Sequence, residues 1–240
     1  MNEARERLIF PLDFPDLNEA LAWVENLNPF VGVFKIGLEL YVKYGPRAVE
    51  EVKKRSPAKI FLDLKLHDIP NTMVGAVRAI SNLGVDFLTV HILSGRKAIE
   101  DLVKTSPWGL KIFGVTILTS LDKADLLELG FNGELASHSE ELALKMAYIA
   151  YRARCDGVVT SAKEVARIKE ALPSLITIVP GIRMEERARD DQLRTATPYE
   201  AILSGADYIV IGRPIREASQ PEVVCKKILE EIERAWGEKG

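Results

Sequence analysis

The sequence predicts an α/β fold, a single (β/α)8 barrel of the TIM type that spans residues 1–240 as one domain. Eight short apolar runs rich in β-branched residues recur along the chain, and a segment of helical periodicity follows each of them. Strands that alternate with single helices imply parallel strands joined by right-handed crossovers. Eight such units close most naturally into a barrel, because closure leaves no strand edge exposed. A doubly wound open sheet is the competing fold.

The expected strands recur at similar intervals and are not divided by a linker. They are the ranges 8–13, 32–36, 59–65, 86–91, 111–116, 157–160, 175–180 and 207–212. The regular spacing is interrupted once, between the fifth and sixth strands, where residues 120–136 add an excursion that we expect to be helical. The series therefore predicts one catalytic domain rather than two.

The expected helices carry recognisable start and stop signals. Asp16 stands three residues before Glu19, and Ser161 three residues before Glu164, which is the spacing of a capping box. The prolines suited to a first helical turn are Pro46, Pro70, Pro198 and Pro221. The glycines suited to a helix end are Gly84 and Gly205.

Charge and hydropathy exclude several classes of protein. The 32 basic and 35 acidic residues give a net charge of −3 without a long run of one sign, which argues against a nucleic-acid partner or a membrane surface. The sequence contains no run of about 18 or more apolar residues, so it does not predict a transmembrane helix. The charged residues 1–7 do not resemble a signal peptide. We therefore expect a cytoplasmic protein. Any phosphate site must be formed by a few neighbouring residues rather than by an extended basic surface.

The cysteines and histidines do not predict a metal site. Cys155 and Cys225 lie far apart and in no metal-binding spacing, so we expect two inert buried thiols rather than a disulfide or a zinc site. The three histidines are not spaced as a cluster either. We expect His67 and His91 at the barrel rim or at an interface, and His138 at the start of a long helix.

Charged side chains gather at the carboxyl ends of the first three expected strands, where barrels of this kind carry their chemistry. Strand alternation places Asp63 and Lys65 on one face, pointing into the barrel mouth. If Lys35 shares the inward face of the neighbouring strand, a row of alternating charge results. A rim salt bridge explains an isolated pair. With Asp13 and Asp68 added, however, such an array costs too much desolvation to serve stability alone.

A second group of candidate residues follows the last two strands, where barrels commonly bind phosphate. Gly181 and Arg183 follow the seventh strand, and Gly212 and Arg213 follow the eighth. Glycine lets backbone N–H groups approach an anion, and arginine offers a bidentate fork. Turn glycines beside surface arginines are the alternative for either loop alone. Two such loops on adjacent strands favour a phosphate site.

Two further segments border the expected mouth. Residues 184–194, with Gln192 near the far end, form a charged stretch too long for a simple connection, which predicts a lid or else a surface loop without function. Thr119 and Ser120 follow the fifth strand. They either hydrogen-bond a polar ligand or cap the next helix, and both alternatives stay open.

These motifs together resemble those of the orotidine 5′-monophosphate decarboxylases. The resemblance rests on DLKLHDIPNT at 63–72, PLDF at 11–14, FKIG at 34–37, TVH at 89–91, TILTS at 116–120, VPGIR at 179–183, Gln192, and IGR at 211–213. A single DxKxxD motif would be weak, because barrels that process sugar phosphates share it. The ordered set, which covers nearly the whole chain, is specific.

The resemblance implies conversion of orotidine 5′-monophosphate to uridine 5′-monophosphate, the last step of de novo pyrimidine nucleotide synthesis, without a metal or an organic cofactor. It implies that Lys65 donates a proton while Asp63 faces the substrate carboxylate. It also implies a homodimer with composite active sites. The remaining implied roles are ribose binding by Asp13 and Lys35, pyrimidine binding by Thr119, phosphate binding by Arg183, Gln192, Gly212 and Arg213, and contribution of Asp68, Ile69 and Thr72 to the partner's site.

Two other functions compete with this one. A magnesium-dependent sugar-phosphate aldolase or decarboxylase has the same kind of barrel, but the ammonium of Lys35 would repel the cation. A non-catalytic nucleotide- or phosphate-binding protein is the third possibility. The intact set of Asp63, Lys65 and Asp68 argues against it.

Overall fold

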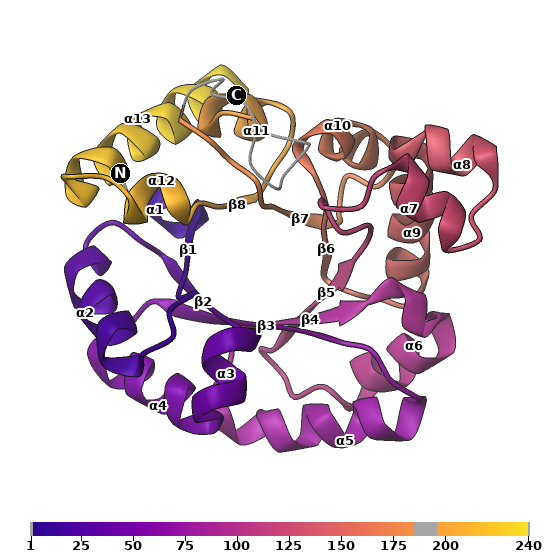
Figure 1. The fold of residues 1–240 in the computed structure, drawn as a ribbon, viewed down its shortest axis with the longest axis horizontal. Helices are drawn as coiled ribbons and strands as arrows, with labels where there is room; N and C mark the ends of the chain where they lie inside the picture. Colours follow the sequence, from indigo (N-terminus) through magenta and orange to yellow (C-terminus); the bar gives the residue numbers. More distant parts are fainter. Residues whose placement is uncertain (1, 185–195, 240) are drawn as a thin grey trace.

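The computed structural model of the chain describes residues 2–184 and 196–239. Within these residues, eight parallel strands form a closed barrel in the order β1 to β8, and helices surround it on the outside (Figure 1). β1 pairs with β2 on one side and with β8 on the other. The predicted (β/α)8 barrel is therefore confirmed, and the open sheet is excluded.

The strands occupy all eight predicted ranges and differ from the prediction mainly at their ends. They are β1 (Leu8–Pro11), β2 (Val33–Gly37), β3 (Lys59–Leu66), β4 (Phe87–His91), β5 (Lys111–Val115), β6 (Gly157–Val159), β7 (Ile176–Val179) and β8 (Tyr208–Val210). We expected Asp13 to be the last residue of the first strand. Because β1 ends at Pro11, Asp13 lies instead in the loop beyond the strand. β3 extends to Leu66, one residue further than predicted.

Helices of very different lengths cover the barrel. The long ones are α2 (Leu17–Leu27), α4 (Pro46–Arg55), α5 (Pro70–Ile80), α6 (Arg96–Thr105), α9 (Ser139–Arg152), α10 (Ala162–Ala171) and α13 (Pro221–Lys239). The short ones are α1 (Asn2–Arg7), α3 (Leu38–Tyr44), α7 (Lys123–Glu128), α8 (Gly133–Ser137), α11 (Pro198–Leu203), α12 (Arg213–Arg216), η1 (Ser81–Leu83) and η2 (Ile92–Ser94). The sequence did not predict α1, α3 or α12, whereas α7 and α8 form the expected helical excursion.

The helix boundaries follow the predicted signals. Asp16 caps α2 by accepting hydrogen bonds from the backbone N–H groups of Asn18 and Glu19. At the start of α10 the Glu164 carboxylate accepts from the backbone N–H of Ser161 at 2.9 Å. The four predicted prolines stand in first turns or at the first residue of α4, α5, α11 and α13. Gly84 and Gly205 have positive φ angles of 63° and 116° just after helical segments.

The barrel interior is filled by apolar side chains beneath the mouth. Inward residues of alternate positions form one buried layer, made of Ile9, Val33, Phe61, Phe87, Phe113 and Ile178. The three phenylalanines pack against one another, with ring centroids between 5.1 and 6.4 Å apart. A larger apolar core lies between the strands and the helices. The interior is therefore filled by side chains at its centre.

Both cysteines are buried, and burial raises the pKa of each thiol to about 12. Each thiol is therefore protonated at neutral pH, which fits the expected inert role. Among the described residues, no helix combines the length and the apolar character needed to span a membrane.

Candidate active site

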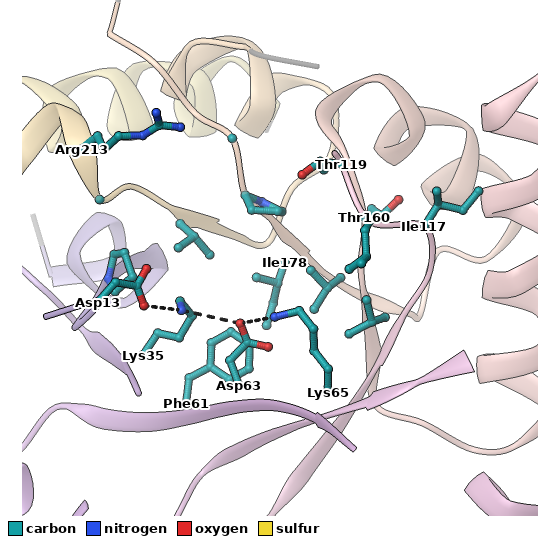
Figure 2. A pocket seen from close by; sticks show the side chains of 18 of the residues that line it. Asp13, Lys35, Phe61, Asp63, Lys65, Ile117, Thr119, Thr160, Ile178 and Arg213 are labelled. Atoms are coloured by element: carbon teal, nitrogen blue, oxygen red, sulfur yellow. Dashed lines mark hydrogen bonds and ion pairs between the residues drawn. The ribbon is translucent and has the colours of Figure 1, made fainter. Parts of the chain in front are cut away.

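A cavity of about 500 Å³ opens at the carboxyl ends of the strands. Figure 2 shows a row of charged side chains on one side of it, with Thr119 and Arg213 on the other side. Eight of the predicted site residues line it, namely Asp13, Lys35, Asp63, Lys65, Thr119, Arg183, Gly212 and Arg213. The structure thus brings together residues that are spread over most of the sequence.

The charged row crosses the ends of β1, β2 and β3 in alternating sign (Figure 2). The Nζ atom of Lys35 lies 3.1 Å from Oδ1 of Asp13 and 3.6 Å from Oδ2 of Asp63. The Nζ atom of Lys65 donates to the same Oδ2 of Asp63 at 2.8 Å. The β2 and β3 register places Lys35 opposite Phe61 and Gly37 opposite Asp63, as the predicted inward faces require.

Burial and charge act against each other in the middle of this row. Burial alone would raise the pKa of Asp63, but the ammonium groups of Lys35 and Lys65 outweigh it, so the pKa lies below its ordinary value. Burial would likewise lower the pKa of Lys35, and the carboxylates of Asp63 and Asp13 raise it instead. Asp63 and Lys35 are therefore both charged at neutral pH.

Gly37 leaves the room that the row needs. A Cβ atom on Gly37 would lie 3.0 Å from Oδ1 of Asp13 and 3.0 Å from Nζ of Lys35. Such contacts are tighter than those that side chains normally make, so a larger residue would push the two charged groups. A side chain at position 37 would therefore require the charged groups of Asp13 and Lys35 to shift by a few tenths of an ångström.

Lys65 reaches the cavity through an unusual backbone conformation. Its φ angle is +50°, in the left-handed region that residues other than glycine seldom occupy. The pairing of β3 with β4 also changes register between Leu62 and Leu66. Simple strand alternation predicted the direction of Lys65 correctly, but for an incomplete reason, because the regular strand geometry is lost before Lys65.

The opposite side of the cavity carries the arginines. Arg183, Arg213 and Arg216 line it, together with Gly181 and Gly212. Arg216 was not predicted; it donates to the carbonyl oxygen of Asp13 at 3.0 Å and so links the loops after β8 and β1. The signal was present in the sequence, since Arg216 stands one helical turn after Gly212, at the end of α12.

The two glycines on this side have different reasons for lacking a side chain. Gly181 has a φ angle of +80°, which favours glycine. A Cβ on Gly212 would lie 2.7 Å from Cγ of Pro11, so close packing against β1 requires this glycine. The prediction gave the approach of an anion as the reason for both glycines, and the packing of Gly212 against Pro11 is a further reason that it did not include.

Apolar side chains form the wall between the charged row and the arginines. Those lining the cavity include Ile117, Val159, Ile178 and Val210. Thr119 lies beside this wall, and α7 begins instead with Asp122 as its cap. The alternative role of Thr119 and Ser120 as helix caps is therefore wrong. The cavity offers cations at two ends and an apolar surface between them, which suits a flat ring joined to an anionic group.

Asp68, Ile69 and Thr72 lie outside the lining of this cavity. The Asp68 carboxylate accepts from the backbone N–H of Ile69 at 2.7 Å, and the Ile69 side chain is 67% exposed. Asp68 and Ile69 border a separate open groove together with Pro70. In a single chain these residues therefore do not meet Lys65.

The predicted lid, residues 184–194, lies outside the described residues except for Met184. Gln192 and the rest of the range 185–195 lie outside the described residues. The segment on either side of this range is anchored, because the backbone N–H of Arg183 donates to the carbonyl of Ala196 at 2.9 Å.

The histidines do not form a metal site within the described part of the chain, which contains no group of three or more potential histidine, cysteine or carboxylate ligands. His67 and His91 stack with ring centroids 5.5 Å apart at the rim near Lys65. Burial and the neighbouring charges of His67 and Lys65 hold the pKa of His91 below its ordinary value. His138 immediately precedes α9, as predicted.

Comparison with known proteins places the chain in a well-populated family. Residues 6–228 match the family described as "Orotidine 5'-phosphate decarboxylase / HUMPS family". An orotidine 5′-phosphate decarboxylase of Wolbachia pipientis subsp. Culex pipiens is 44% identical over 94% of this chain and 98% of its own length. One from Moorella thermoacetica is 42% identical over 96% of this chain and 93% of its own.

A solved structure is similar over the same extent. The crystal structure of orotidine 5′-phosphate decarboxylase from Lactobacillus acidophilus superposes with a TM-score of 0.79 and 32% sequence identity. The match covers 94% of this chain and 98% of that one. Sequence and fold comparisons thus agree over nearly the full length.

Proposed function

The chain belongs to the orotidine 5′-phosphate decarboxylase / HUMPS family, and we propose that it is a carboxy-lyase that converts orotidine 5′-monophosphate to uridine 5′-monophosphate. This is the last step of de novo pyrimidine nucleotide synthesis. The observation that carries the proposal is the charged row, in which two ammonium groups share the buried carboxylate of Asp63 on one side of the cavity.

The cavity supports one orientation of this substrate. The 5′-phosphate would bind to Arg183, Arg213 and the backbone of Gly212, and the family resemblance adds Gln192 to this set. The ribose hydroxyls would contact Asp13 and Lys35, and the pyrimidine would lie against the apolar wall within reach of Thr119. This orientation directs C6 and its carboxylate toward Asp63 and Lys65. It uses the two cationic ends of the cavity and the apolar surface between them.

In the proposed reaction the bond from C6 to the carboxylate carbon breaks, CO2 leaves, and the electron pair stays on C6. The ammonium of Lys65 stabilises this developing negative charge better than it stabilises the substrate, whose charge is spread over the departing carboxylate. It then transfers a proton to C6 and regains one from solvent. An interaction between unit charges about 4 Å apart contributes roughly 4 kcal/mol at an effective dielectric near 20. The reaction uses neither a metal nor an organic cofactor.

Asp63 and the phosphate site support this step in different ways. The 2.8 Å hydrogen bond from Lys65 to Asp63 fixes the position of the ammonium. Asp63 also faces the place of the departing carboxylate, and their repulsion would be relieved as CO2 leaves. Binding energy from the phosphate, gathered by Arg213 and the lid, would offset the cost of bringing these like charges together.

A direct assay tests the proposal. The purified chain should convert orotidine 5′-monophosphate to uridine 5′-monophosphate and CO2, followed by loss of substrate absorbance and by chromatography of the product. A chelator should leave the rate unchanged. Absence of turnover would contradict the proposal, and turnover abolished by the chelator would favour the magnesium-dependent alternative.

We further propose that the chain works as a cytoplasmic homodimer of single-domain subunits, in which Asp68, Ile69 and Thr72 complete the partner's site. The support is their position outside their own cavity, with Ile69 exposed beside an open groove. In the partner's site Asp68 would provide a second carboxylate near Lys65.

Mixed dimers test this arrangement. Lys65→Ala and Asp68→Ala subunits should each be almost inactive alone and regain activity when mixed and exchanged. One site of each mixed dimer then contains both an intact Lys65 and an intact Asp68. If exchanged mixtures stay as inactive as the separate variants, Asp68 does not act across the interface.

A further inference from the structure

We propose that Thr89 is a positioning residue for Asp63 and Lys65. This inference rests on the proposed decarboxylation and adds a residue to it that does not line the cavity. Thr89 lies in β4, next to the end of β3, and its side chain is 0% exposed. Its hydroxyl contacts both residues that would act at C6 of the substrate.

The chain leaves regular strand geometry at the point where Thr89 stands. Leu62 pairs with Leu88 and Leu66 pairs with Val90, so residues 63–65 of β3 lie opposite the single residue Thr89 of β4. Regular backbone pairing cannot satisfy all the polar groups of such a bulge. The backbone N–H of Lys65 donates instead to Oγ1 of Thr89 at 2.9 Å.

The direction of the hydrogen bonds around Thr89 follows from what each group can do. A backbone N–H can only donate, so the hydroxyl oxygen accepts from Lys65. The hydroxyl proton is then directed to Oδ1 of Asp63, at 2.9 Å. The other carboxylate oxygen, Oδ2, accepts from Nζ of Lys65. Thr89 therefore binds the backbone of Lys65 and the carboxylate that holds its ammonium.

This arrangement explains how Lys65 keeps its left-handed backbone. A φ angle of +50° is unfavourable for lysine, and such conformations persist only where surrounding contacts support them. Here one buried hydroxyl supports the backbone, and Asp63 supports the end of the side chain. Without the hydroxyl, the Lys65 N–H loses its acceptor and the Asp63 carboxylate loses a donor. Both can then shift, and the ammonium moves relative to C6.

Three variants separate the hydroxyl from the shape of the side chain. Thr89→Val keeps the shape and removes the hydroxyl, and we expect kcat to fall about 10- to 100-fold, the usual effect of losing a hydrogen bond to a charged group. KM should change little, because Thr89 does not line the cavity. Thr89→Ser should restore kcat to within a few-fold of the wild type. Thr89→Ala, which lacks the same methyl group as the serine variant, should not.

Thr177→Val is the matched control. Thr177 is also 0% exposed, and its hydroxyl donates to the carbonyl of Gly205 at the opposite end of the barrel. This variant loses a buried hydroxyl without touching the charged row, so its kcat should stay at the wild-type value even if its stability falls. Hydrogen exchange of the Lys65 backbone amide, followed by NMR, gives a readout that needs no substrate. Exchange should become faster in Thr89→Val and stay unchanged in Thr177→Val.

The outcomes distinguish this inference from the proposed function. An inactive wild type would contradict the decarboxylase proposal, and the amide exchange of Lys65 would still decide the role of Thr89. An active wild type with normal kcat in Thr89→Val would overturn the inference alone. If Thr89→Val does not fold, equal kcat values for Thr89→Ser and Thr89→Ala would overturn it, and a difference of about tenfold or more would support it.

Discussion

The two ends of the barrel use aspartate for different purposes. At the amino ends of the strands, Asp86, Asp156 and Asp207 each stand just before an even-numbered strand and accept a hydrogen bond from the backbone of the preceding strand. The donors are Ile60, Ile112 and Thr177, each at 2.8 Å. At the carboxyl ends, Asp13 and Asp63 instead accept from the ammonium groups of lysine side chains that line the cavity. Asp207 also pairs with an ammonium, that of Lys169, but neither residue lines the cavity.

The difference lies in what the partners can do. A backbone N–H cannot titrate or change its position without disrupting the strand, so the aspartates of the amino ends hold neighbouring strands in place. An ammonium on a flexible side chain can give up a proton and can exchange its partner for a ligand. The same residue type is therefore structural at one end of the barrel and chemical at the other. Variants placed at the two ends can test this contrast.

The largest contrast is expected within β3, which has a lysine near each end. Lys65→Ala should lower kcat by about 1000-fold or more while the protein stays folded, because it removes both the proton donor and a charge aimed at C6. Lys59→Ala removes only an ion pair with Glu6 at the other end of the strand, and its kcat should match the wild type. Steady-state assays with circular dichroism as a folding check would measure both. Comparable losses in the two variants would remove the contrast.

Arg213 should affect substrate binding rather than the chemical step. Arg213→Ala should raise KM about 10- to 100-fold, because it removes charge-assisted hydrogen bonds to the phosphate. Arg47→Ala, at an exposed position on α4, is the matched control and should bind the substrate normally. Inhibition by inorganic phosphate, measured for the three proteins, should weaken only in Arg213→Ala. An unchanged KM there would exclude Arg213 from the phosphate site.

At the amino ends, the expected effect is on stability. Asp86→Ala removes the acceptor of the Ile60 N–H and should lower the free energy of unfolding by about 1 to 2 kcal/mol. Asp86→Asn keeps an acceptor oxygen and should recover part of that loss. Urea denaturation of both variants measures the difference. Equal stability of Asp86→Ala and the wild type would show that this hydrogen bond contributes nothing.

The smallest effect concerns the dependence of stability on pH. The pKa of Asp63 lies below its ordinary value of 3.8, so its ionisation stabilises the fold fully above that pH and progressively less as the pH falls through the folded-state pKa. Asp63→Asn does not titrate. Its free energy of unfolding should therefore vary less than that of the wild type below about pH 4. Urea denaturation at several pH values measures this free energy for both proteins. The same pH dependence in Asp63→Asn and the wild type would contradict the lowered pKa of Asp63.

Features that depend on regular patterns could be predicted from the sequence. Apolar runs located all eight strands, and alternation placed Lys35 beside Asp63 across two neighbouring strands. The positions of Arg183 and Arg213 followed from the known use of the last two loops in such barrels. These predictions were confirmed as positions, because strand geometry and barrel closure determine them.

Features that depend on a single tertiary contact could not be predicted. The backbone turn at Lys65 needs the hydroxyl of Thr89, which is 24 residues away in the sequence. The need for glycine at position 212 comes from Pro11, on the strand that closes the barrel. The short helices α1 and α12 are stabilised by packing rather than by periodicity, since they have too few turns to show a repeat.

The most direct test compares one substitution at the two ends of the barrel. Asp63→Ala and Asp86→Ala each remove one aspartate carboxylate, and kcat/KM for orotidine 5′-monophosphate should be measured for both alongside the wild type. For Asp63→Ala we predict a loss of about 100-fold or more, because the Lys65 ammonium loses the carboxylate that holds it within its own subunit. For Asp86→Ala we predict a value within a few-fold of the wild type. Normal activity in Asp63→Ala, or an equal loss in both variants, would contradict the assignment of the chemistry to the charged row.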